Sequence, residues 1–366
     1  MPFSILLRTV ALFSFIAFAA VLSTLYTFNE FEDHATEFDG QCVQVAGIPR
    51  PEDIQVDFET RRVFVASASE TGRGGIFSLS IDDPLESSGW RDLTGGTPEQ
   101  FTPRGLHLYE GQGVRRLFVV NSAVGGVEIF DLLENGALVH LKTVLDRRLT
   151  SPSDVVGTGP ESFYVVNNAD TDDGSVLWTM KFIARARAGS ILHFNGTSFR
   201  VAAQSLRFPS GIGINQTGDT LLVSETSGGV ISFFGVESKT GHLTPVTKVS
   251  VNAGPDKLNL TPSGKFLLTV HPKPLKLAFR NSTKPADTPS LVMMIDPIIG
   301  GAKKRVGNTG TSSFEKAKLH EANGAEVFAN GGDFIAGARV ADTIDDKLVI
   351  GALREDKFLI CDSSQG

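Results

Sequence analysis

Residues 61–81, RRVFVASASETGRGGIFSLSI, contain two segments rich in β-forming residues, separated by a polar, glycine-rich turn. Comparable units follow at five further places: residues 115–136, 161–180, 219–236, 264–279 and 346–362. Most of these units begin roughly 45 to 60 residues after the previous one, a spacing typical of four-stranded propeller blades. The repeats therefore predict an all-β fold, a six-bladed β-propeller over residues 40–362.

The composition agrees with this prediction. The chain has 366 residues, of which 38 are glycine and 26 are phenylalanine, and only 20% are charged. Such a composition favours short strands joined by tight turns in one large domain over long helices. The formal net charge of -7 argues against a nucleic acid partner, since phosphate binding requires clustered lysine and arginine.

Residues 1–30 form a hydrophobic segment that is expected to be helical, because Arg8 is the only ionised side chain between residues 3 and 28. Residues 9–28 are long and apolar enough to span a membrane as a signal anchor. The small residues of FAAVLS, residues 18–23, equally favour a cleaved signal peptide. Either prediction places the protein in the secretory pathway, secreted or anchored to the membrane and facing the lumen or the outside.

Two other features favour the same compartment. The chain contains four glycosylation sequons, which begin at Asn195, Asn215, Asn259 and Asn281. Its two cysteines are Cys42 and Cys361, which are expected to pair in an oxidising compartment, with two buried free thiols as the alternative. A disulfide between them would tie the first strand to the last, where a propeller must close its ring.

Short motifs precede or follow the strands at the places where the loops of a propeller gather around its central channel. They are PEDI (51–54), PRGL (103–106), SPSDVV (151–156), FPSGIGI (208–214), GPDKLNL (254–260) and TVHP (269–272). In PEDI, Glu52 and Asp53 are neighbours, and neighbouring side chains on an extended strand point to opposite faces. The two carboxylates therefore need two different partners, or none if both lie in a solvated turn.

These motifs resemble those of the paraoxonase/arylesterase family, within the wider gluconolactonase and strictosidine-synthase-like propellers. The resemblance runs from about Cys42 to Cys361 and includes the early and late cysteines. It implies a calcium-dependent hydrolase of lactones and esters, with one structural and one catalytic calcium ion in the channel.

The resemblance implies that Asp53, Asp154 and the backbone carbonyl of Leu106 hold the structural ion. For the catalytic ion the family uses Glu, Asn, Asn, Asp and Asn. The corresponding residues in this chain are Glu52, Ser153, Ser210, Asp256 and Lys257.

Lys257 makes the catalytic site unlike that of the family, since a charged lysine cannot bind a cation. We expect its ammonium group to pair with Glu52 and Asp256 in place of the ion, unless a one-residue shift of register turns it away. The histidine pair that the family uses to activate water is also absent, because Arg104 and Ser122 stand at the two positions. His271, in TVHP, matches a family histidine that lines the pocket. The catalytic candidates are His271, Glu52, Lys257 and Arg104.

The sequence thus predicts a hydrolase of a small lactone or ester with a degenerate catalytic calcium site. One alternative is a propeller that binds a ligand or protein without hydrolysis. Another is a metal-independent isomerase or lactonising enzyme that uses Lys257. The direction of the Lys257 side chain distinguishes these hypotheses.

Overall fold

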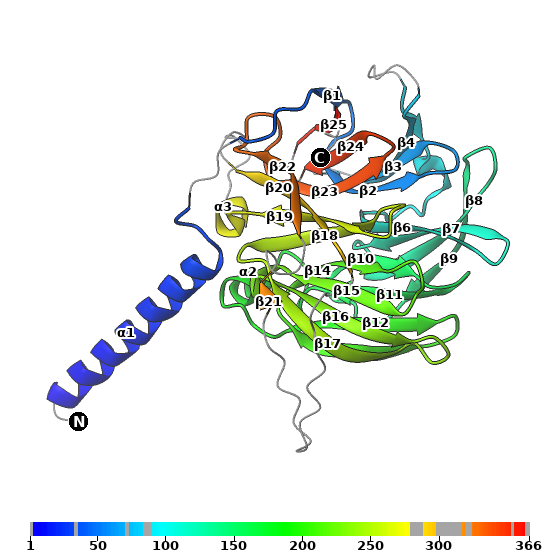
Figure 1. The fold of residues 1–366 in the computed structure, drawn as a ribbon. Helices are drawn as coiled ribbons and strands as arrows, with labels where there is room; N and C mark the ends of the chain where they lie inside the picture. Colours follow the sequence, from blue (N-terminus) through cyan, green and yellow to red (C-terminus); the bar gives the residue numbers. More distant parts are fainter. Residues whose placement is uncertain are drawn as a thin grey trace, which may run out of the picture.

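The computed structural model describes residues 3–32, 36–69, 73–82, 89–278, 288–297, 317–318, 324–352 and 355–362. Six sheets are arranged in a ring, and the colours in Figure 1 pass from blue through green to red, which lies again beside blue. The first strand of each blade contacts the first strands of the neighbouring blades, so these six strands surround the channel. The predicted six-bladed β-propeller is confirmed.

The blades are built from consecutive strands. Blade 1 contains β2 (Pro51–Asp57), β3 (Arg62–Ser67), β4 (Gly75–Ser80) and β5 (Arg91–Asp92). Blade 2 contains β6 (Pro103–Gly111), β7 (Val114–Asn121), β8 (Gly126–Leu132) and β9 (Leu138–Leu145). Blade 3 contains β10 (Pro152–Gly157), β11 (Ser162–Asn167), β12 (Gly189–Asn195) and β13 (Phe199–Leu206). Blade 4 contains β14 (Pro209–Ile214), β15 (Thr220–Glu225), β16 (Val230–Glu237) and β17 (His242–Ser250), and β21 (Ala317–Lys318) pairs with β17 as a fifth strand. Blade 5 contains β18 (Gly254–Leu260), β19 (Phe266–His271), β20 (Ser290–Ile295) and β22 (Ala325–Asn330).

Blade 6 closes the ring with strands from both ends of the chain. It contains β23 (Ala338–Ile344), β24 (Lys347–Ala352) and β25 (Lys357–Asp362), and its outer strand is β1 (Cys42–Ala46). β1 pairs antiparallel with β25, and Cys42 lies opposite Cys361. The two cysteines form a disulfide across 319 residues, as expected from the sequence.

The hydrophobic core lies between the blades. Each of six apolar clusters combines residues from two neighbouring blades. The cluster that contains Val56 and Val63 of blade 1, for example, also contains Val349 and Phe358 of blade 6. Five of the six inner strands are buried almost throughout, while β6 is largely half-buried. A polar side chain on a buried inner strand needs a partner inside the protein.

Two repeats contain a helix where their second segment was expected to be a strand. Residues 176–180 belong to α2 (Val176–Ile183), which begins after Ser175, whose side chain accepts a hydrogen bond from the backbone of Trp178. In the fifth repeat, α3 (Pro274–Ala278) takes the place of the expected strand. The third strands of these blades come later in the chain, as β12 and β20. Short 3-10 turns, η1 (Thr94–Gly96) and η2 (Thr226–Gly228), complete the described elements.

The N-terminal helix α1 (Phe3–Thr27) extends away from the propeller in Figure 1. Its end is anchored, because Phe28 is fully buried and stacks on Phe182 of α2, which packs against Phe208. Within the described residues, no helix combines the length and apolarity needed to cross a membrane. The signal peptide or signal anchor in residues 1–30 stays a prediction.

The four sequons lie in different environments. Asn195 is exposed, and Asn215 is half-buried, with its amide donating to Asp219. Asn281 lies outside the described residues. Asn259 contradicts the prediction, because its side chain is buried on β18 and its amide nitrogen donates to the carbonyl oxygens of Ile54 and Ala341. A glycan on that nitrogen is incompatible with this fold.

Candidate functional site

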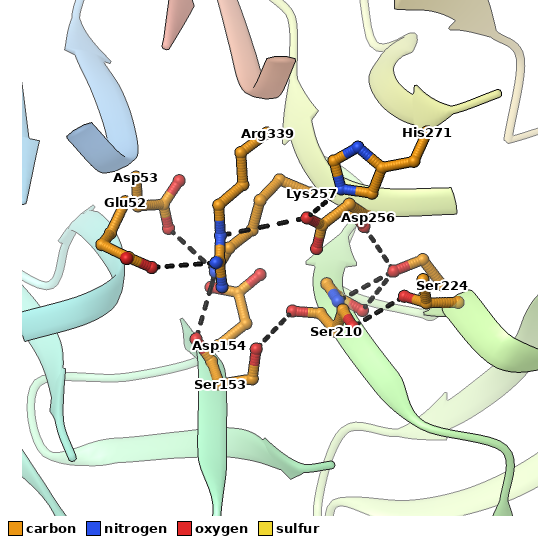
Figure 2. A network of polar contacts seen from close by, with 12 residues as sticks. Glu52, Asp53, Ser153, Asp154, Ser210, Ser224, Asp256, Lys257, His271 and Arg339 are labelled. Carbon is orange, nitrogen blue, oxygen red and sulfur yellow. Dashed lines mark hydrogen bonds and ion pairs between the residues drawn. The ribbon is translucent and has the colours of Figure 1, made fainter. Parts of the chain in front are cut away.

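The channel residues are presented by an irregularity that occurs in all six inner strands. Close to its start, each inner strand shifts register once against the second strand of its blade. In blade 1 the shift falls between Pro51 and Asp53, so Glu52 is the extra residue. A bulge breaks the alternation of a regular strand. Glu52 and Asp53 can therefore both face the channel (Figure 2).

Aligned on these bulges, the six inner strands supply two successive channel positions. The first is occupied by Glu52, Arg104, Ser153, Ser210, Asp256 and Arg339, and the second by Asp53, Gly105, Asp154, Gly211, Lys257 and Val340. At the second position, charged residues alternate with glycine or valine around the ring. The glycines let neighbouring strands approach, since a Cβ atom at Gly105 would lie 2.2 Å from Oδ1 of Asp154.

The charged residues of the second position form a group that we call the lysine cluster: Lys257, Asp53 and Asp154, with the carbonyl of Ser153. Nζ of Lys257 lies 3.3 Å from Oδ2 of Asp53, 3.0 Å from Oδ1 of Asp154 and 3.1 Å from the Ser153 carbonyl oxygen. All three side chains are buried. An ammonium group has three hydrogens to donate, and each has an acceptor here.

This arrangement corrects two predictions. Lys257 does not pair with Glu52 and Asp256, because the bulge in β18 directs it to the aspartates that were expected to hold the structural calcium ion. Leu106 is close to this site, but its backbone N–H donates to Oδ2 of Asp53 at 2.8 Å. The expected ligand was its carbonyl oxygen.

A second group, which we call the arginine cluster, consists of Arg339, Glu52, Asp256 and His271 (Figure 2). Nη1 of Arg339 lies 2.9 Å from Oε2 of Glu52, and Nε lies 3.9 Å from Oδ2 of Asp256. Nε2 of His271 lies 2.8 Å from the same Asp256 oxygen. Because an ionised carboxylate only accepts hydrogen bonds, Nε2 carries the proton.

Burial and the two cations determine how the carboxylates ionise. Burial raises the pKa of Asp53 and raises that of Asp154 to about 7, against the lowering effect of Lys257. Burial also acts to raise the pKa of Asp256, but Arg339 and the hydrogen bond from His271 lower it below its usual value. Although burial disfavours the charge of Arg339, Glu52 and Asp256 raise the pKa of its guanidinium. The arginine cluster thus keeps the carboxylate of Asp256 ionised.

The arginine cluster has buried polar atoms that make no hydrogen bond to any described residue. They are Oε2 of Glu52, Oδ1 of Asp256, Nδ1 of His271 and Nε of Arg339; the contact of Glu52 with Arg339 is an ion pair without hydrogen-bond geometry. Buried polar atoms are normally paired, so these four mark a place where a polar ligand or water molecule fits.

The remaining predicted site residues have other contacts. The hydroxyl of Ser153 donates to the backbone carbonyl of Ser210, and the hydroxyl of Ser210 lies 2.6 Å from that of Thr226. Arg104 forms an ion pair with Asp173 in the loop before α2. Neither serine hydroxyl is paired with a channel carboxylate in the structure.

Arg339 is the channel residue that the sequence analysis missed. TVHP, the sixth motif of the sequence, ends β19, which is the second strand of blade 5 and does not begin a blade. The sixth inner strand begins with ARVA, residues 338–341, which lacks the proline present in the other five. Aligning the first residues of all six blades, in which two channel residues are followed by an apolar residue, could have identified Arg339.

The residues do not fit the two calcium ions that the resemblance implies. A calcium ion takes six to eight oxygen ligands. The ammonium of Lys257 lies between Asp53 and Asp154, and the guanidinium of Arg339 lies between Glu52 and Asp256. Among the described residues, no group of three or more histidine, cysteine or acidic side chains is arranged to hold a metal.

Fold and site together define a six-bladed propeller with a charged, buried channel site. The arylesterase family model matches residues 64–363, and the chain belongs to that family. It is 26% identical over 296 residues to mouse (Mus musculus) serum paraoxonase/lactonase 3, covering 79% of this chain and 77% of that protein. It is also 26% identical over 267 residues to human (Homo sapiens) serum paraoxonase/arylesterase 1, covering 72% of this chain and 68% of the relative.

Solved structures share the fold at low sequence identity. A gluconolactonase from Xanthomonas campestris has a TM-score of 0.55 at 14% identity, over 90% of this chain and 92% of that one. Regucalcin from Agrobacterium tumefaciens, described as a calcium-binding protein, has a TM-score of 0.52 at 12% identity, over 91% and 98%. At these identities the likeness concerns the fold alone.

Proposed function

We propose that the protein hydrolyses a small lactone or ester in the propeller channel, with the arginine cluster as its active site. The family and the names of the relatives support the substrate class. The observation that carries the proposal is the geometry around Asp256. This carboxylate is hydrogen-bonded to Nε2 of His271, whose other ring nitrogen, Nδ1, has no partner among the described residues.

The hydrogen bond from Nε2 to Asp256 fixes the tautomer of His271, so that Nδ1 carries the free lone pair. An imidazole oriented by a carboxylate is the usual arrangement of a general base. Asp256 also stabilises the imidazolium that forms when Nδ1 takes a proton. In this proposal His271 is the base and Asp256 its positioning residue.

The proposed reaction needs only water as co-reactant. Nδ1 of His271 removes a proton from water as the water oxygen bonds to the carbonyl carbon, and the carbonyl electron pair moves onto its oxygen. Arg339 stabilises this negative oxygen. The bond to the leaving oxygen then breaks, and the proton passes from His271 to that oxygen. A lactone yields one hydroxy acid, and an ester yields an acid and an alcohol.

In this proposal Lys257 has a structural role. Its three hydrogens are matched by Asp53, Asp154 and the Ser153 carbonyl, which leaves none directed at a substrate. A lysine whose ammonium group is buried and donates all three hydrogens to protein acceptors is neither a nucleophile nor a base. The isomerase or lactonising hypothesis built on Lys257 therefore has less support than hydrolysis.

A non-hydrolytic binding propeller is the second candidate. The observation that favours it is Arg104, which stands where the family resemblance implies a histidine and is engaged by Asp173. Ser122, at the other expected histidine position, donates its hydroxyl to the carbonyl of Thr102. If catalysis required that histidine pair, the channel would bind a ligand without turning it over.

We also propose that the protein enters the secretory pathway. The disulfide between Cys42 and Cys361 supports this, because disulfides persist mainly in oxidising compartments. The relatives that are named serum paraoxonases support it as well.

The test is turnover of a panel of lactones and aryl esters by the wild type and by His271→Gln. We expect the variant to lose about 10²–10⁴-fold in kcat, the usual contribution of general acid–base catalysis. His242→Gln, an exposed histidine on β17, is the matched control and should keep full activity. If the folded wild type turns over no substrate while calorimetry shows that it binds one, the binding propeller is the better description.

A further inference from the structure

We infer that Lys257 is a covalently attached replacement for a metal ion, and that the folded protein is stable without calcium because this lysine neutralises the buried aspartates. The inference does not depend on whether the channel hydrolyses a substrate. It concerns the lysine cluster and not the arginine cluster, where we place the chemistry.

The first argument is the number of partners around the two carboxylates. Asp53 accepts backbone N–H groups from Ile54 at 2.9 Å and from Leu106 at 2.8 Å. Asp154 accepts them from Val155 at 3.0 Å and from Ile212 at 3.0 Å. With Lys257 added, every carboxylate oxygen has a partner. A metal ion between the two carboxylates would have to replace the contacts that Lys257 makes with them.

The second argument is the position of the ammonium group. Nζ of Lys257 has the two carboxylates and one backbone carbonyl as neighbours. Two aspartates and a carbonyl are also the kind of oxygen ligands that a calcium ion takes. Its distances of 3.0 to 3.3 Å suit ammonium hydrogen bonds, whereas calcium ligands lie at about 2.3–2.6 Å.

The third argument is electrostatic. A divalent cation beside the buried ammonium would be repelled by its like charge, and the protein interior screens this repulsion much less than water does. Lys257 is buried and held by three acceptors, so it cannot move into solvent without leaving the aspartates uncompensated. Calcium and Lys257 therefore compete for one place.

The fourth argument concerns what a substitution would open. A cavity of about 150 Å³ adjoins the cluster, lined among others by Leu106, Asp154 and Asn259. Lys257→Asn would remove the cation, supply an amide oxygen and leave room for water molecules, which are common calcium ligands. Lys257→Met removes the same charge and supplies no oxygen, which makes it the matched control.

The experiment uses the full chain and calcium ions as the probe, without substrate. Each protein is treated with EGTA, dialysed and returned to millimolar calcium, and metal content and Tm are measured before and after. We expect no stoichiometric calcium in the wild type and the same Tm in both buffers. In Lys257→Asn we expect one bound calcium ion and a Tm that rises by several degrees with calcium. Lys257→Met should show neither response.

One result overturns the inference: wild-type protein that retains stoichiometric calcium and loses stability on chelation. The wild-type measurement decides even if Lys257→Asn does not fold. Because activity is not the readout, a wild type that binds calcium would leave the proposed role of His271 standing. Conversely, a catalytically inactive wild type with a calcium-independent Tm would support this inference and not the hydrolase.

Discussion

The lysine cluster and the arginine cluster are two solutions to the same problem, a pair of buried carboxylates at the start of the inner strands. In the lysine cluster the three ammonium hydrogens and all four carboxylate oxygens are partnered. In the arginine cluster, polar atoms of Asp256, His271 and Arg339 make no hydrogen bond to any described residue.

The same repeated geometry can therefore provide stability in one place and chemistry in another. A fully partnered ion cluster has no site left for a ligand, and removing one member leaves an uncompensated buried charge. A partly satisfied cluster costs stability unless a ligand or water completes it. The comparison predicts that substitutions in the lysine cluster reduce stability and that those in the arginine cluster reduce activity.

The largest expected effect is that of Lys257→Met. Removing the ammonium leaves two carboxylates without their cation, and breaking a buried pair in this way costs about 3–5 kcal/mol. Chemical denaturation at neutral pH measures the loss. Lys347→Met, which breaks an exposed pair with Asp362, is the control and should cost about 0–1 kcal/mol. Equal losses in the two variants would show that Lys257 contributes no more to stability than an exposed ion pair.

Arg339→Lys should come next, and its effect should fall on turnover. Lysine keeps the charge but loses the planar fork of donors, and removing one oxyanion-stabilising donor costs about 10²–10³ in kcat, or about 2.7–4 kcal/mol. Steady-state kinetics on a hydrolysed lactone measures this. Arg61→Lys, in an exposed pair with Asp82, should be silent. An unchanged kcat together with a lowered Tm would show that Arg339 has a structural role instead.

Asp342 tests the comparison further, because it is a buried carboxyl that forms no ion pair with any described residue. Burial raises its pKa from 3.8 to about 8, while backbone N–H groups of Val56 and Thr343 act to lower it. The folded state then holds a proton that the unfolded state has released. Its stabilising contribution is complete below pH 3.8 and is lost as the pH rises to about 8.

Asp342→Asn should therefore flatten the dependence of stability on pH. The wild-type slope from this one group is at most about 1.4 kcal/mol per pH unit between these limits. Unfolding free energies at pH 5, 6 and 7.5 measure it for both proteins. Parallel curves for the two proteins would show that Asp342 is ionised in the folded state, as in a cluster with its own cation.

The smallest expected effect is that of Ser153→Ala. The contact of Ser153 with Lys257 is made by its backbone carbonyl, which alanine retains, and its hydroxyl donates only to the carbonyl of Ser210 at 3.0 Å. We expect a loss of about 1 kcal/mol in stability and no change in turnover. A large loss of turnover would instead place the hydroxyl in the active site, as the sequence prediction had it.

The sequence predicted those features that repeat or that follow from simple pairing rules. Spacing gave six blades, and the two cysteines predicted the closure of the ring. Glu52, Asp53, Asp154, Asp256 and His271 were also predicted as site residues, because the motifs that contain them resemble those of the family.

The partners of these residues could not be predicted, for a physical reason. Which face a side chain takes depends on a bulge of one or two residues, and sequence pattern alone does not place a bulge. Lys257 was consequently assigned to the wrong pair of acids, and Arg339 was missed because its motif lacks proline. The buried environment of Asn259 could not be predicted for another reason: a sequon carries no information on whether its asparagine is exposed.

The closure of blade 6 by β1 also affects how the protein folds during its synthesis. β1 is synthesised early, but its partner strand β25 and Cys361 follow 319 residues later. At about 5–20 residues per second the ribosome needs about 15 to 65 seconds to make that stretch. Throughout this interval β1 has no strand to pair with, and an unpaired strand readily joins other chains. The nascent protein therefore depends on its surroundings to keep Cys42 and β1 unreacted until the last strand emerges.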